Sequence, residues 1–276
     1  MPRSVITLLS GMAALLVLLQ APKEASAHLL AVTDENSTIE IDPHTESGLR
    51  TWQVDGVNHL FEQWFWYGVG ATGPEASLDT LNLIQEELQG SDTIHLAYAG
   101  ALLNVDVLYA LQGQSAGASR IDEWVTLQST SQDPLALRWF EYTDLDLAGT
   151  SEGDSAALAA PGTIVQSEGA ASITVASLSQ VPTHWQIGEF PSILGLLSDD
   201  DPIPTILADG VSPLGPGDLT FAWQYNLLLA PSGESLQLHR THTLGPFGQP
   251  QPVPEPASVS LLGLGLGALI VRRRRA

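Results

Sequence analysis

The chain has 276 residues, no cysteine, and 31 acidic residues against 10 lysines and arginines. The lack of cysteine excludes disulfides, thiolate metal sites and cysteine nucleophiles. Positions 28 to 253 hold 29 acidic residues, four arginines and no lysine, which gives this body a formal charge of −25. Because such a body repels nucleic-acid phosphates and anionic lipid, we expect no nucleic-acid partner.

The first 27 residues have the pattern of a secretory signal. Arg3 supplies the positive start, an apolar stretch follows, and Ala25 and Ala27 occupy the two small-residue positions that a signal peptidase reads. The sequence therefore predicts a signal peptide over residues 1–27 and a mature chain that begins at His28. A retained N-terminal anchor is the alternative.

After His28 the dominant periodicity is two, which indicates strands. Six strand-length runs alternate in polarity or are rich in β-branched and aromatic residues, and turn formers separate them. They are 101–111, 121–128, 135–142, 172–176, 219–230 and 235–241. The Pro-Ser-Gly-Glu segment at 231–234 predicts a hairpin turn between the last two. The pattern predicts one all-β ectodomain over residues 28–248, an antiparallel β-sandwich or jelly-roll-like fold.

We also expect one or two short helices in this ectodomain. Residues 75–89 place leucines and an isoleucine on one helical face, although the first half alternates enough for an edge strand. Residues 191–197 begin with a proline, which suits the first turn of a helix, and an acidic, proline-bearing stop follows them. A helix of one or two turns fits that second segment.

Five aromatic residues occur between positions 61 and 67. On a strand, Trp64 and Trp66 point to the same side, because side chains alternate between faces. These two indoles are candidates for a platform that stacks on sugar rings. The alternative is that they fill a second layer of the core.

Asp144 and Asp146 form an acidic pair at the end of a predicted strand. Calcium binds six to eight oxygen ligands, often from loop carboxylates, so this pair is a candidate calcium site. Strand-end capping is the alternative, and we expect no other cofactor. His239 and His242 lie three apart in a predicted strand, so we expect them on opposite faces and not on a shared zinc ion.

The C-terminal segment, residues 249–276, has three parts. A proline-rich break contains Pro254, Glu255 and Pro256, an apolar run follows over residues 257–271, and the chain closes with a basic stop of Arg272, Arg273, Arg274 and Arg275. A helix of those 15 apolar residues covers ~22 Å of a ~30 Å hydrocarbon core. The pattern predicts a transmembrane helix that anchors the chain transiently in the inner membrane, with the arginines on the cytoplasmic side.

The order of these three parts resembles the PEP-CTERM sorting signal of exported bacterial proteins. The resemblance implies recognition by an exosortase, an integral-membrane protease and transpeptidase. That enzyme would cut near residues 254–256 and release or transfer the body toward the cell surface, commonly in bacteria that make exopolysaccharide. Glu255 would then be recognised by another protein.

These features together predict an exported protein of the cell envelope, cell surface or extracellular matrix, associated with extracellular polysaccharide and without catalytic activity. Signal peptidase and exosortase are the expected processing partners. The alternative is a carbohydrate-active, glycoside hydrolase-like enzyme on the same β-sandwich scaffold. Such an enzyme needs two carboxylates about 5–10 Å apart, and their pairing is defined in space rather than in sequence.

Overall fold

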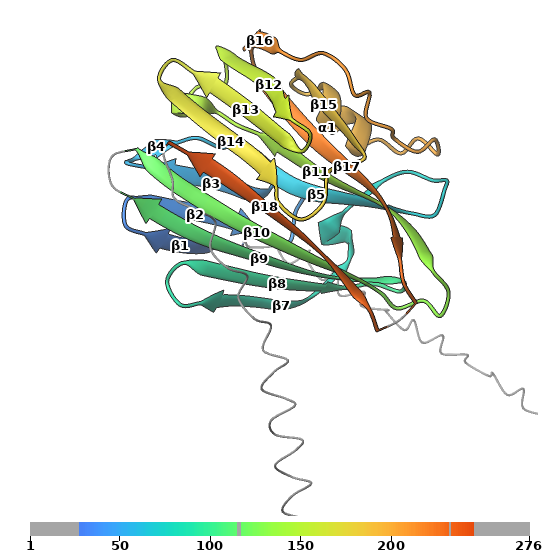
Figure 1. The fold of residues 1–276 in the computed structure, drawn as a ribbon. Helices are drawn as coiled ribbons and strands as arrows, with labels where there is room; N and C mark the ends of the chain where they lie inside the picture. Colours follow the sequence, from blue (N-terminus) through green and yellow to red (C-terminus); the bar gives the residue numbers. More distant parts are fainter. Residues whose placement is uncertain (1–27, 115–116, 232, 246–276) are drawn as a thin grey trace, which may run out of the picture.

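The structure is a computed structural model that describes residues 28–114, 117–231 and 233–245. Two layers of β-sheet, mainly antiparallel, face each other (Figure 1). The all-β class with two antiparallel sheets is therefore confirmed. The predicted signal helix and transmembrane helix lie outside the described residues, and no helix within those residues is long and apolar enough to cross a membrane.

The first layer, sheet A, has the strand order β1-β2-β3-β5-β11-β17-β15, with β4 paired to β3 and β6 to β5. Its strands are β1 (Leu30–Asp34), β2 (Ser37–Asp42), β3 (Gly48–Val54), β4 (Val57–Asn58), β5 (Glu62–Val69), β6 (Ala76–Ser77), β11 (Leu135–Asp144), β15 (His184–Glu189) and β17 (Leu219–Leu229). The pairing of β3 with β5 is parallel, and it is limited to the start of each strand.

The second layer, sheet B, has the order β16-β12-β13-β14-β18-β10-β9-β8-β7. Its strands are β7 (Asn82–Gln89), β8 (Thr93–Ala99), β9 (Leu103–Gln114), β10 (Ala118–Ser129), β12 (Asp154–Ala160), β13 (Thr163–Glu168), β14 (Ala171–Ser177), β16 (Leu214–Gly217) and β18 (Ser235–Leu244). Three short helical segments complete the fold: η1 (Leu78–Thr80), η2 (Leu147–Gly149) and α1 (Ser192–Leu197).

The strand-length runs predicted from the sequence are all strands, but one predicted connection is wrong. Residues 231–234 do not close a hairpin, because β17 pairs with β11 and β15 while β18 pairs with β10 and β14. The chain crosses from sheet A to sheet B at this turn, and it crosses in the opposite sense between β10 and β11. Turn residues specify a reversal of the chain, but they do not specify which sheet receives the next strand.

Of the two segments predicted to be helical, one forms a helix and the other does not. Residues 191–197 do form the short helix α1. Residues 75–89 instead form β6, the single turn η1 and β7, which is an edge strand of sheet B. Ile84 and Leu88, which a helix would have buried, are 62% and 46% exposed. Charged side chains on β7 are typical of an edge strand that resists pairing with other chains.

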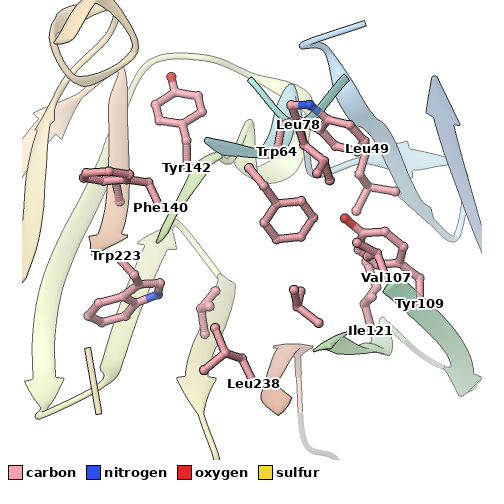
Figure 2. Packing of buried hydrophobic residues seen from close by; sticks show 14 of the residues in the cluster. Leu49, Trp64, Leu78, Val107, Tyr109, Ile121, Phe140, Tyr142, Trp223 and Leu238 are labelled. Carbon is pink, nitrogen blue, oxygen red and sulfur yellow. The ribbon is translucent and has the colours of Figure 1, made fainter. Parts of the chain in front are cut away.

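The core between the sheets is rich in aromatic side chains. Figure 2 shows Leu49 from sheet A facing Val107, Tyr109 and Ile121 from sheet B, with Trp64 beside Leu78. Five tryptophans of the hydrophobic core cluster are almost fully buried: Trp52, Trp64, Trp66, Trp139 and Trp223. The indole N–H of Trp52 donates a hydrogen bond of 2.9 Å to Ser119 Oγ on the opposite sheet. Large aromatic groups therefore hold together a domain that has no disulfides.

Candidate functional site

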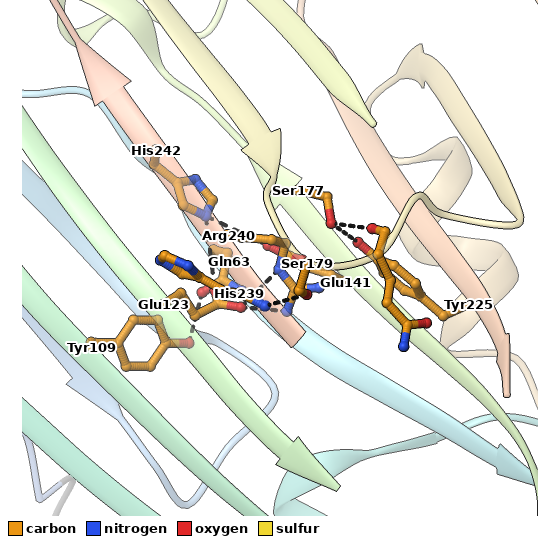
Figure 3. A network of polar contacts seen from close by, with 11 residues as sticks. Gln63, Tyr109, Glu123, Glu141, Ser177, Ser179, Tyr225, His239, Arg240 and His242 are labelled. Atoms are coloured by element: carbon orange, nitrogen blue, oxygen red, sulfur yellow. Dashed lines mark hydrogen bonds and ion pairs between the residues drawn. The ribbon is translucent and has the colours of Figure 1, made fainter. Parts of the chain in front are cut away.

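Four ionisable side chains from both sheets meet in one cluster at the centre of the sandwich (Figure 3). Glu123 comes from β10, Glu141 from β11, and Arg240 and His242 from β18. Nε of Arg240 donates a hydrogen bond of 2.9 Å to Oε1 of Glu123, and the guanidinium also forms an ion pair with Glu141. Nε2 of His242 lies 3.5 Å from Oε1 of Glu141 and 3.8 Å from Oε2 of Glu123. Charged groups thus join the two layers.

Burial and charge have opposing effects on the protonation of this central ion cluster. Burial alone would lower the pKa of His242, but its contacts with the two glutamates and their negative charges raise the pKa to about 9. Burial would raise the pKa of Glu123, but Arg240 and His242 hold that pKa below its usual range. Burial, reinforced by the charge of Glu123, outweighs Arg240 at Glu141 and raises the pKa there.

The central ion cluster also has the spacing of a metal site. Ligand atoms of Glu123, Glu141 and His242 all lie within 4.8 Å of one another. The guanidinium of Arg240, however, already contacts both carboxylates and supplies the positive charge that a metal ion would bring. Because a metal ion would have to displace this buried cation, the residues fit a self-neutralised ion cluster better than a metal centre.

Sheet B carries a second polar network on its outer face, which points away from sheet A. Alternation along β10 places Arg120, Asp122 and Trp124 there, opposite Glu123. The Asp122 carboxylate accepts a hydrogen bond of 2.8 Å from Nε of Arg120, and its Oδ1 lies 3.2 Å from Nε2 of His239. The His239 ring stacks on Trp124 with 4.7 Å between ring centroids. This outer network combines an aromatic pair with an ion pair.

The placement of the two histidines of β18 agrees with the sequence prediction. His239 belongs to the outer network, whereas His242 belongs to the central ion cluster on the inner face. The two imidazoles therefore lie on opposite faces of sheet B and do not share a ligand site.

Five carboxylates form a third group near the ends of the strands, which we call the strand-end carboxylates: Glu62, Asp144, Asp146, Asp154 and Asp218. Asp144 ends β11 and pairs across the sheet with Glu62, which begins β5. Asp144 Oδ2 accepts a hydrogen bond of 3.3 Å from the Tyr142 hydroxyl. Asp154 Oδ2 accepts one of 2.6 Å from the side-chain amide of Gln166. Among the described residues, three carboxylate oxygens of this group have no hydrogen-bond partner: Oε1 of Glu62, Oδ1 of Asp144 and Oδ1 of Asp154.

Burial raises the pKa values of the strand-end carboxylates. Burial, followed by the negative charges of Asp146 and Asp218, raises the pKa of Asp144 to about 8. Burial raises the pKa of Glu62 to about 7, with a further contribution from Glu46, and burial likewise raises the pKa of Asp154 to about 7. Carboxyl groups of this kind hold a proton near neutral pH, or they ionise when a cation is nearby.

The sequence-predicted site residues have different environments in the structure. Trp64 and Trp66 are 0% and 1% exposed, so neither indole offers a face for stacking on a sugar in this conformation. Trp64 packs edge-on against Tyr98 of β8, and Trp66 packs against Tyr142. Both therefore follow the second alternative, a place in the core.

The candidate calcium pair lies among the strand-end carboxylates. Asp144 is 2% exposed, and the charge of Asp146 acts on its pKa. In the part of the chain that the structure describes, neither aspartate belongs to a group of three side chains with metal-ligand spacing. Calcium at this pair stays a prediction. The residues predicted for signal cleavage (Ala25, Ala27), sorting (Pro254, Glu255, Pro256) and the basic stop (Arg272, Arg273, Arg274, Arg275) lie outside the described residues.

Strand periodicity does not predict the central ion cluster, although the sequence contains one signal for it. Glu123 lies in phase with the buried apolar residues Ile121 and Val125 of the same strand. Arg240 stands in phase with Leu238 in the same way. A charged residue in the apolar phase of a strand indicates either a buried ion pair or a functional site.

Comparison with known proteins gives two kinds of likeness. A family model for the PEP-CTERM protein-sorting motif matches residues 252–275. The tail therefore carries this sorting motif, which marks the chain as an exported protein, sorted at the membrane and processed by an exosortase. Comparison with curated protein sequences gives no match.

Solved structures resemble the described fold at low sequence identity. A bacterial glucoamylase complexed with acarbose aligns with a TM-score of 0.56 and 9% identity, over 90% of this chain and 36% of that chain. A putative aldose 1-epimerase from Escherichia coli K12 aligns with a TM-score of 0.50 and 10% identity, over 79% of this chain and 98% of that chain. This chain thus spans about a third of the glucoamylase, and at such identity the likeness concerns the fold alone.

Proposed function

We propose that the ectodomain is a surface or extracellular-matrix protein that associates with extracellular polysaccharide and has no catalytic activity. The observation that carries this proposal is the sorting motif at residues 252–275. Signal peptidase would remove residues 1–27, and exosortase would cut near residues 254–256 after the tail has held the chain briefly in the inner membrane. Residues 28–248 would then reach the cell envelope, the cell surface or the matrix.

Burial of the central ion cluster supports a non-catalytic role. Glu123 and Glu141 have His242 and Arg240 beside them, yet both carboxylates are 0% exposed. A polysaccharide cannot contact either group unless the two sheets separate. Their environment is that of a core ion cluster rather than that of a cleft.

The outer face of sheet B supports association with polysaccharide. Around the outer network, β9, β10 and β18 present part-exposed amide and hydroxyl side chains: Asn104, Gln112, Thr126, Gln128, Gln237 and Thr243. Such groups donate to and accept from sugar hydroxyls. Because the body carries a formal charge of −25, a neutral or cationic polysaccharide fits this face better than an anionic one.

Co-sedimentation tests the association. Mature protein from native cells is mixed with exopolysaccharide from the same cells, and the protein in the pellet is measured. We expect the double variant Gln128→Ala, Gln237→Ala to be retained less than the wild type. Gln53→Ala, an exposed glutamine on sheet A, is the matched control and should be retained normally. Equal retention of the wild type and the double variant would contradict the proposed face.

Intact mass and C-terminal peptide mapping test the sorting step. Protein is recovered separately from envelope and medium, and we expect a mature species that starts at His28 and ends near residues 253–255. Glu255→Ala or deletion of residues 272–275 should leave an unprocessed, membrane-bound chain. Normal processing of both variants would argue against exosortase recognition of this tail.

The strand-end carboxylates favour a second candidate, a glycoside hydrolase-like enzyme. A carboxyl group whose pKa is raised to about 7 or 8, as at Glu62 and Asp144, has the acidity of a general acid at neutral pH. Release of reducing sugar from a panel of polysaccharides distinguishes the two functions. Activity in the wild type that Asp144→Asn abolishes would replace the first proposal with this one.

A further inference from the structure

Two histidines and a glutamate meet at one edge of the sandwich, far along the chain from one another. His28 precedes β1, His44 lies in the turn between β2 and β3, and Glu86 lies on β7. Nδ1 of His28 is 3.3 Å from Oε1 of Glu86, and Nε2 of His44 is 3.4 Å from Oε2 of the same carboxylate. Ligand atoms of all three residues lie within 4.8 Å of one another.

Hydrogen bonds hold the three segments in this arrangement. The Tyr98 hydroxyl of β8 donates a hydrogen bond of 2.8 Å to the carbonyl of Pro43, next to His44. The N–H of His44 itself donates to Asp42 Oδ1 at 3.1 Å. The N–H of Thr33 on β1 donates to the carbonyl of Ser91, in the turn between β7 and β8, at 3.0 Å. The edge of sheet A that carries the histidines is therefore fastened to the hairpin that carries the glutamate.

Cross-strand register explains why Glu86 faces the histidines. Glu86 pairs with Leu96 of β8, and Leu96 is fully buried in the core. Glu86 thus lies on the side of β7 that faces sheet A. Because β7 is an edge strand, this position is open, and the side chains of His28, His44 and Glu86 are 61%, 50% and 32% exposed. An ion can reach all three from solvent.

The ligand set identifies a class of metal. Two imidazole nitrogens and one carboxylate oxygen suit zinc, copper and nickel, and among these divalent ions copper(II) generally binds such sites most tightly. The proposed signal cleavage after Ala27 would add a fourth ligand, the free α-amino group of His28. An α-amino nitrogen and Nδ1 of the same histidine can close a six-membered chelate ring on one metal ion, and Nδ1 is the atom that already faces Glu86.

We propose that export creates a copper(II) site at the mature N-terminus. Its ligands are the α-amino nitrogen and Nδ1 of His28, Nε2 of His44 and the carboxylate of Glu86. Three nitrogens and one oxygen suit the tetragonal geometry of copper(II). The inference rests on the proposed signal cleavage, but it does not depend on what the outer face of sheet B binds.

The competing account is a pair of ordinary surface ion pairs between histidines and a carboxylate. Exposed pairs of this kind contribute about 0–1 kcal/mol to stability and need no metal. His184 and Asp209 form such a pair elsewhere on the surface, with 2.6 Å between Nδ1 and Oδ2. His184→Ala is therefore the matched control, because it removes a partly exposed histidine beside a carboxylate without touching the proposed ligands.

The test uses mature protein purified from its cells, stripped with a chelator and titrated with copper(II) sulfate. Intact mass first establishes whether the chain begins at His28. We expect one copper per chain, with an electron paramagnetic resonance spectrum that reports three nitrogen ligands. Loss of an outer-shell partner typically weakens metal binding 10–100-fold. His44→Ala removes a ligand itself, so it should weaken binding at least tenfold, whereas His184→Ala should bind like the wild type.

A chain with Gly-Ser inserted after Ala27 separates the amino group from the side chains. After cleavage it keeps the side chains of His28, His44 and Glu86 but moves the α-amino group two residues away, and we expect at least tenfold weaker binding. If this variant binds copper as tightly as the wild type, the α-amino group is not a ligand and signal cleavage does not create the site. Copper binding by the wild type no tighter than by His44→Ala would overturn the site. A mature chain that does not begin at His28 would instead overturn the proposed signal cleavage.

Discussion

Arg240 of β18 and Glu141 of β11 form an ion pair between the two sheets, and both side chains are 0% exposed. The same guanidinium contacts Glu123 and lies 5.7 Å from the ring centroids of Phe65 and Tyr225. Together with the protonated His242, this guanidinium balances the charge of two carboxylates that would otherwise be buried without a partner. Its loss should cost far more than the loss of a surface arginine.

Arg240→Met is expected to lower the free energy of unfolding by about 3–5 kcal/mol, because it leaves buried carboxylates uncompensated. Urea denaturation at pH 7 measures the change. Arg50→Met, at an exposed arginine of β3, is the control and should stay within about 0.5 kcal/mol of the wild type. Adding Glu123→Gln and Glu141→Gln to Arg240→Met should recover part of the loss. No recovery would show that packing, rather than charge, sets the cost.

The raised pKa of His242 predicts that the domain becomes less stable as pH rises above neutral. Its folded pKa is raised to about 9 from an ordinary value of 6.5, so the folded state holds a proton that the unfolded state releases between these values. The contribution is complete below about pH 6.5 and is lost as pH rises through 9, with an upper limit of about 3 kcal/mol. Urea titrations from pH 6 to 9.5 should show this decline, and His242→Gln should flatten it. An unchanged slope in the variant would assign the decline to other groups.

The raised pKa of Asp144 also predicts that stability falls as pH rises, but over a lower range of pH. Because burial raises its folded pKa to about 8, the folded state resists ionisation, and stability falls as pH rises from about 4 to 8. Asp144→Asn removes the charge at nearly constant shape. We expect the variant to be more stable than the wild type at pH 8, by on the order of 1 kcal/mol or more, and nearly equal at pH 5. Equal stability at pH 8 would mean that a cation already neutralises the site.

The same variant tests calcium at Asp144 and Asp146. Calcium that binds the folded state raises the melting temperature of the wild type with increasing concentration. We expect a rise at pH 8 for the wild type and none for Asp144→Asn, and a chelator should reverse it. A rise of equal size in both proteins would place calcium elsewhere.

Gly48 and Gly56 give a matched pair for the packing of Trp64. Both have a positive φ, +45° and +84°, but a Cβ at Gly48 would lie 2.1 Å from Trp64 Cε3, whereas at Gly56 it would meet nothing within 4 Å. Gly48→Ala should therefore destabilise the domain well beyond Gly56→Ala, which carries only the backbone strain of about 1 kcal/mol. Thermal melts of both variants measure the difference. Equal melting temperatures would mean that both the indole and the Gln63 carbonyl, which lies 2.7 Å from the same Cβ position, move aside.

Strand periodicity was sufficient to predict the class of fold, because residues such as Val105, Val107 and Tyr109 alternate cleanly with more exposed neighbours. It was not sufficient to predict which strands share a sheet. The central ion cluster depends on that information, since Glu123 and Arg240 pair across 117 positions of the chain. Trp64 and Trp66 show a related limit, since a strand pattern gives the side on which a ring lies but not what covers that side.

The position of β18 has a consequence for the order of events during export. This last described strand is not at an edge, but lies between β14 and β10, and it carries Arg240 and His242. A chain that crosses the membrane N-terminus first delivers β18 last, so the acidic core has no cationic partner until translocation of the body is nearly finished. The apolar run of the tail then follows after only 12 further residues, a tether of at most about 45 Å. Under the proposed sorting step, in which the apolar run holds the chain in the inner membrane, β18 would therefore complete the sheet beside the bilayer, as a late vectorial step.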